Sequence, residues 1–161
     1  MNNIKLKKDL INKDKYQVFL CVCPANLLFS FAIHPWFVIN HKGTVSRWEV
    51  LFPRRKHNLR FGYLNKNFYS LFQGIEILPF SQKYFWKGKI LSKIEGDENS
   101  VAAQMIDFIE KSNQNYPYTE KYCLIGPNSN TYIQWVLNYF PQSNMVLPWN
   151  AIGKNKARKL K

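Results

Sequence analysis

The sequence predicts a single α+β domain in which a small antiparallel sheet with a histidine-bearing hairpin packs against two or three helices. Strand-like runs, rich in β-branched and aromatic residues, fill the first third of the chain. Apolar residues at helical spacing follow within residues 97–112 and 131–139. A chain of 161 residues, 46% of them hydrophobic, is long enough to build one core.

The first three elements are strands. Residues 16–23 form an apolar run that predicts a buried strand, and residues 27–40 and 44–52 predict two more. The turn sequence at residues 40–43, Asn-His-Lys-Gly, joins the second and third strands in a hairpin. Pro35 lies inside the second strand, which indicates an edge position or a bulge because proline has no N–H to donate.

The remaining elements are shorter, and helices dominate the second half. Residues 54–72 are predicted to be irregular with short helical or strand pieces, and residues 84–94 hold further short strands. The clearest helix spans residues 97–112, with acidic residues at its favourable N-terminal end. One short apolar strand is expected in the connection to the second helix. That helix spans residues 131–139 and is ended by Pro141.

Charge divides the chain into a basic arm at residues 1–15, one domain at residues 16–154 and a basic tail at residues 155–161. The net charge of +13 favours anionic partners such as nucleic acid, acidic membrane or acidic glycan. Most of this charge lies in the two tails and one loop, so only a weak, salt-sensitive anion or nucleic-acid contact is expected. No apolar run is long enough for a transmembrane segment, and a cytoplasmic location is expected.

Three cysteines, an odd number without a regular framework, argue against a disulfide-stapled secreted protein. Cys21 and Cys23 are two residues apart and share a face if the segment is a strand. Buried free thiols are therefore expected. The chain has no CxxC and no histidine pair at metal spacing, so neither a metal site nor a cofactor is predicted.

The stretch "IGPNSNTYIQWVLNYFP" at residues 125–141 is the most patterned part of the chain. A Gly-Pro turn and a cluster of small polar residues precede a helix. Asn128, Ser129, Asn130 and Thr131 are all good helix caps, which explains the cluster without chemistry. The same geometry suits a nucleophile, because a helix N-terminus stabilises negative charge. Ser129 is therefore either part of a cap or a nucleophile.

A serine nucleophile needs a base. His34 is the candidate, because it is a titratable residue inside the apolar run "FAIHPWFVI". Glu49, on the paired strand, falls roughly opposite His34 and could orient its ring. Arg47 shares a face with Glu49 and could either contact a ligand or tie Glu49 into a structural ion pair. The other two histidines, His41 and His57, are expected at the surface.

The segments "AIHPWFVIN", "RWEVLF", "GPNSNTYIQWVLNYFP" and "LPWNAIGK" together resemble the uncharacterised bacterial domain-of-unknown-function family 3750 over most of the chain. In this chain Trp149 stands where the family pattern has smaller residues. A more distant resemblance, in element order only, is to permuted NlpC-type papain-like domains. That resemblance implies a hydrolase or acyltransferase, but those enzymes have a cysteine at the position of Ser129.

The predicted function is a papain-like hydrolase or acyltransferase on an amide or ester of a small-molecule or peptide-like substrate. Ser129 would be the nucleophile, and Asn128 or Asn130 would donate to the oxyanion. The first alternative is a non-catalytic binding domain of the same fold. The second is an anion or nucleic-acid binder, whose basic residues would be Arg54, Arg55, Lys56 and Arg60.

Overall fold

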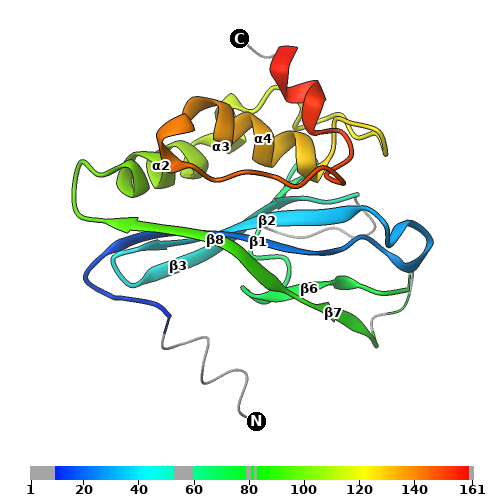
Figure 1. The fold of residues 1–161 in the computed structure, drawn as a ribbon, viewed down its shortest axis with the longest axis horizontal. Coiled ribbons are helices and arrows are strands. Elements are labelled where there is room, and N and C mark those ends of the chain that lie inside the picture. Colours follow the sequence, from blue (N-terminus) through cyan, green and yellow to red (C-terminus); the bar gives the residue numbers. More distant parts are fainter. Residues whose placement is uncertain (1–9, 53–59, 79–80, 82, 160–161) are drawn as a thin grey trace.

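The computed structural model describes residues 10–52, 60–78, 81 and 83–159. They form three layers, with the helices on one face of a main sheet and a two-stranded sheet beneath its other face (Figure 1). No helix in the described part of the chain is long and apolar enough to cross a bilayer.

The main sheet has six strands in the order β4-β5-β3-β2-β1-β8, and every neighbouring pair is antiparallel. Its strands are β1 (Tyr16–Pro24), β2 (Ile33–His41), β3 (Thr44–Val50), β4 (Arg60–Phe61), β5 (Leu64–Lys66) and β8 (Lys89–Gly96). The small sheet pairs β6 (Gln73–Glu76) with β7 (Phe85–Lys87).

The helical layer contains α2 (Val101–Glu110), α3 (Ser112–Asn115) and α4 (Ser129–Tyr139). Three short 3-10 helices complete the chain: η1 (Leu27–Phe29), η2 (Pro141–Ser143) and η3 (Lys154–Lys159). Helix α2 begins where the Ser100 side chain accepts a hydrogen bond from the backbone N–H of Ala103, and it buries Met105 and Ile106 against the sheet.

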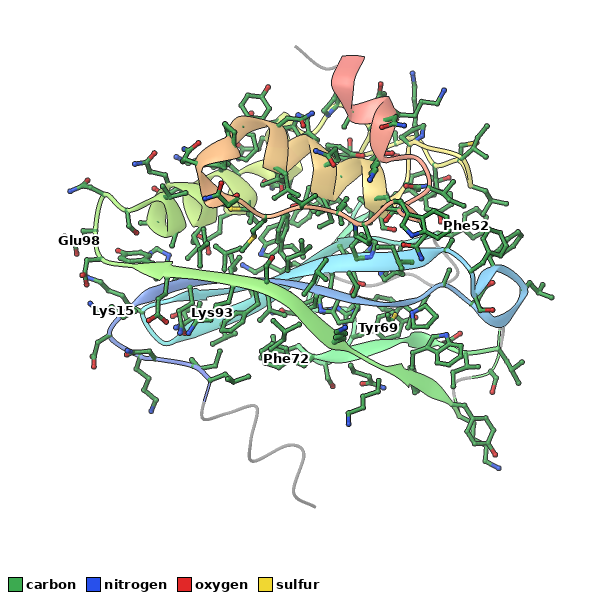
Figure 2. All side chains as sticks on the ribbon, in the orientation of Figure 1. Lys15, Phe52, Tyr69, Phe72, Lys93 and Glu98 are labelled. Carbon is green, nitrogen blue, oxygen red and sulfur yellow. The ribbon has the colours of Figure 1, made fainter. Side chains whose placement is uncertain are left out.

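The central strands β1 and β2 are buried on both faces, so the main sheet separates two hydrophobic cores. Successive strand side chains point to opposite faces. On β2, Phe37 and Ile39 pack beneath the helices in what we call the helix-side core. Trp36 and Val38 pack on the other face in the small-sheet core, which also contains Phe72. Figure 2 shows Phe72 on the side of the main sheet away from the helices.

The predicted α+β class, with its hairpin of paired strands under helices, is confirmed. Strand β1 and the β2–β3 hairpin lie where the sequence placed them. Cys21 and Cys23 are buried free thiols on one face, as expected, whereas Cys123 is exposed.

Several predicted element boundaries were wrong. Residues 27–32 are not strand: η1 forms there because Phe29 and Ala32 donate to carbonyls three residues earlier. Helix α2 starts at Val101 rather than residue 97, because β8 continues to Gly96 and Ser100 is the cap. Helix α4 starts two residues earlier than expected, at Ser129.

Two further expectations need correction. The connection between α2 and α4 contains α3 and turns instead of an apolar strand. Pro35 lies in an interior strand rather than at the edge of the sheet. It is tolerated there because the pairing of β2 with β3 begins only at Phe37, which leaves that stretch of β2 paired on one side.

Candidate functional site

A buried ionic cluster of Arg47, Glu49 and His34 lies on the small-sheet side of the main sheet. Glu49 Oε2 accepts a hydrogen bond from Arg47 Nη2 at 2.6 Å and lies 2.8 Å from His34 Nε2. Arg47 Nε and Glu49 Oε1 are also 2.6 Å apart, but they are not aligned as a hydrogen bond, so this contact is an ion pair only. The structure thus brings together three of the residues singled out from the sequence.

The guanidinium of Arg47 is fully enclosed. Its Nη1 donates to the backbone carbonyls of Ser70 and Gln73, at 2.8 Å for Ser70. The guanidinium carbon lies 4.2 Å from the centre of the Trp36 ring and 5.3 Å from that of Tyr69, and Figure 2 shows Tyr69 beneath the main sheet. The face of the Arg47 guanidinium lies against aromatic rings and its edge contacts carbonyls and a carboxylate, an arrangement typical of a structural ion pair.

Within the ionic cluster, the positive charge of Arg47 offsets the negative charge of Glu49. Burial by itself raises the pKa of the Glu49 carboxyl, but the Arg47 charge and the His34 hydrogen bond outweigh it and hold that pKa below its usual value. Cys23 is the cross-strand partner of His34, and burial raises the pKa of its thiol to about 12. The thiol therefore stays protonated at neutral pH and is not a nucleophile.

At the other face of the sheet, Asn128 is the cap of α4. Its Oδ1 accepts hydrogen bonds from the backbone N–H groups of Asn130, at 3.0 Å, and Thr131, at 3.3 Å. Thr131 Oγ1 accepts in return from the Asn128 backbone N–H, completing a capping box. Ser129 is consequently the first helical residue and not the cap.

Three asparagines tie three loops to the start of α4. Asn128 Nδ2 donates to the carbonyls of Leu124 at 2.9 Å and Ile152 at 3.1 Å. Asn130 Nδ2 donates to the Ile152 and Ile33 carbonyls at 2.9 and 3.2 Å. These bonds, with one from Asn150 Nδ2 to the Phe31 carbonyl at 3.0 Å, hold residues 27–33, 124–128 and 149–152 together.

The alternation of β2 separates Ser129 from the ionic cluster. Ile33 packs against the helix-side core and its carbonyl contacts the start of α4. His34, the next residue, faces the small-sheet side, where it stacks against Trp36 with ring centres 6.1 Å apart. Among the described residues, the His34 ring is hydrogen-bonded to Glu49 and not to Ser129. Close approach of His34 to the Ser129 hydroxyl stays a prediction, which this alternation disfavours.

Ser129 is nevertheless nearly buried, with 5% of its surface exposed. Asn130, beside it, carries a side-chain oxygen that is buried and has no hydrogen-bond partner among the described residues. The polar side chains that make hydrogen bonds at this helix end are thus those of Asn128, Asn130 and Thr131.

The three loops that converge on α4 expose large apolar side chains, and we call this surface the apolar end. It consists of Leu28, Phe31, Leu124, Ile125 and Trp149, whose exposed fractions run from 61% for Leu124 to 90% for Trp149. Phe52, whose ring centre lies 5.3 Å from that of Tyr122, adjoins the second loop and marks this end of the molecule in Figure 2.

The opposite end of the molecule is charged. Lys42 in the β2–β3 turn contacts Glu98 at 2.5 Å, and Lys15 contacts Asp97 at 2.8 Å. Figure 2 shows Lys15 and Glu98 together at the end away from Phe52. The nine residues of β2 run from the apolar end to the charged end, about 27 Å apart.

The remaining candidates lie elsewhere or outside the described residues. His41 ends β2 and lies 3.5 Å from Glu110. His57 and the basic residues Arg54, Arg55 and Lys56 fall outside the described residues, and Arg60 is described only as part of β4. Among the described residues, no group of three histidine, cysteine or acidic side chains could hold a metal ion.

Sequence reasoning missed two members of these sites. Cys23 shares the ionic cluster, and the antiparallel register opposite His34 was the signal that could have found it. Asn150 ties the third loop to the first. The sequence pattern that could have identified Asn150 is weak. Only the recurrence of asparagine near Pro and Gly residues distinguishes Asn150 from an ordinary turn residue.

Fold and site together define a small α+β domain whose main sheet has a helical layer over one face and a buried ionic cluster under the other. The chain belongs to the DUF3750 family of proteins of unknown function, whose family model matches residues 16–156. No match was found among curated proteins or among solved structures.

Proposed function

We propose that this domain is a non-catalytic binding module that engages an apolar partner through the apolar end. The single observation that carries this proposal is the gathering of five exposed large apolar side chains on three loops tied to one helix start. Soluble monomers seldom expose apolar patches of this kind without a binding role.

The buried ionic cluster supports the non-catalytic interpretation. A histidine acting as general base must reach the proton that it abstracts. His34 is 7% exposed, it contacts the Glu49 carboxylate, and it faces the small-sheet core. The buried ion pair of Glu49 with Arg47 holds the carboxylate that contacts His34 in a fixed position away from solvent, which favours a structural role for these residues.

The proposal is tested by titrating isotope-labelled protein with micelles of dodecylphosphocholine, a zwitterionic detergent with an apolar chain. The chemical shifts of the backbone amides are followed by NMR. We expect the shifts to concentrate in residues 27–33, 124–128 and 149–152, because the exposed side chains lie there. Trp149→Ser should weaken the response, whereas Leu91→Ser, on the edge strand β8, should not. Shifts spread evenly over the sheet and helices, or none at all, would contradict the proposal.

The catalytic alternative, a serine hydrolase or acyltransferase using Ser129, makes a different prediction. We expect no labelling of wild type by a fluorophosphonate probe above the level of Ser129→Ala, because no base among the described residues is hydrogen-bonded to the hydroxyl. The thiol of Ser129→Cys, measured in a Cys123→Ser background, should react with a thiol reagent no faster than the exposed Cys123 of wild type. Labelling that disappears in both Ser129→Ala and His34→Ala would establish the catalytic function instead.

A further inference from the structure

We infer that the partner of the apolar end is an anionic lipid surface, into which Trp149 inserts; this inference rests on the proposed binding function. The occupant is identified by two properties of the surface: which side chains protrude and which charges surround them.

The protruding side chains suit the boundary between headgroups and acyl chains. They comprise one tryptophan, one phenylalanine and three aliphatic residues on three loops. Tryptophan is favoured at membrane interfaces because its large apolar ring carries one polar N–H. Trp149 is the most exposed of the large apolar residues described, at 90%.

The three loops of the apolar end carry no negative charge, and lysines lie beside two of them. No acidic residue occurs between Lys121 and the C-terminus, or between Lys15 and Trp48, so the three loops carry no carboxylate. Lys154 Nζ lies 2.7 Å from the Pro148 carbonyl, directly before Trp149. The side chain of Lys156 packs beside Gly126, next to Ile125. Lysines near a membrane are attracted to anionic lipid, at about 1 kcal/mol each.

Three described carboxylates lie at the far end of the molecule, whereas Glu76, which ends β6, and Glu120, which lies beside Gly62, are outside the three loops of the apolar end. Asp97 and Glu98 pair with lysines at the charged end, and Glu110 contacts His41 at the other end of β2 from Ile33. A domain whose loops at one end carry apolar side chains and lysines without a carboxylate has a defined orientation on an anionic surface.

The test compares binding of the whole chain to phosphatidylcholine vesicles and to vesicles that also contain phosphatidylglycerol, by co-sedimentation. We expect binding to be roughly tenfold tighter or more with phosphatidylglycerol, and this preference to fall as salt is raised. Trp149→Ser and Leu28→Ser should each lower the partition coefficient roughly tenfold. Leu91→Ser is the matched control and should change it little.

Insertion of Trp149 has its own readout. Trp36, Trp48 and Trp135 are buried and Trp86 is partly exposed, so the contribution of Trp149 to quenching by brominated lipid is the difference between wild type and Trp149→Phe. We expect quenching in wild type and a large drop in Trp149→Phe, which should still bind because phenylalanine also inserts. Binding without this quenching overturns the orientation that we infer.

The outcomes separate the two proposals. Micelle shifts at the apolar end without a preference for phosphatidylglycerol vesicles would overturn the lipid inference and leave the binding module intact. Absence of both would overturn both proposals. Self-association in sedimentation velocity that Trp149→Ser abolishes, without vesicle binding, would assign the apolar end to a second copy of this chain and overturn the lipid inference.

Discussion

Replacing Glu49 with alanine is expected to lower the free energy of unfolding by about 3–5 kcal/mol. The substitution leaves the Arg47 guanidinium, which has no exposed surface, without its counter-charge. It also removes the acceptor for the His34 ring. Urea unfolding followed by circular dichroism measures the loss, at constant pH and ionic strength.

Two controls isolate the cause. Glu95→Ala removes an exposed carboxylate that pairs with Lys93 and accepts from Gln17 Nε2. Because Gln17 Nε2 also donates to the Leu10 carbonyl, this change should cost about 1 kcal/mol or less. Arg47→Met combined with Glu49→Leu removes both charges and should recover most of the loss, since an apolar pair of similar volume has no charge to leave unpaired. If Glu49→Ala cost no more than Glu95→Ala, the cluster would not brace the sheet.

Replacing Asn128 with alanine is expected to lower the free energy of unfolding by about 2–4 kcal/mol. The change removes the cap of α4 and strips the Leu124 and Ile152 carbonyls of a donor. Asn128→Asp should recover only the capping part, because a carboxylate accepts from the helix N–H groups but cannot donate to the two carbonyls.

Ser129→Ala is the matched control at the neighbouring position. It should change the free energy of unfolding by about 0.5 kcal/mol or less, because the hydroxyl has no hydrogen-bond partner among the described residues whose loss would be felt. Urea unfolding of the three variants gives the comparison. Should Asn128→Asp prove as stable as wild type, the loop ties would contribute nothing.

Local patterns were enough to predict much of the fold. The apolar run of β1, the turn residues after β2 and the apolar spacing of α4 depend on near neighbours, so they appear in the sequence directly. The element boundaries that were predicted wrongly depend on one or two local hydrogen bonds. The start of α2 at Val101 is decided by the Ser100 cap, and η1 by two backbone hydrogen bonds.

The candidate site was predicted in part for the same reason. The contact of His34 with Glu49 follows from the hairpin, because the turn sets which residues of β2 and β3 are close. The position of Ser129 relative to His34 depends on which face of the sheet α4 covers. The apolar runs of β1 and β2 are buried on both faces, so their pattern does not distinguish the face beneath the helices.

The asparagine ties have a consequence for the strength of any binding at the apolar end. Ordering a loose loop on binding costs free energy that is subtracted from affinity. Here hydrogen bonds from Asn128, Asn130 and Asn150 already fix the three loops to one helix in the free protein. The surface is thus preorganised, so little affinity is lost to ordering the loops, and loosening a tie would weaken binding without touching any contact residue.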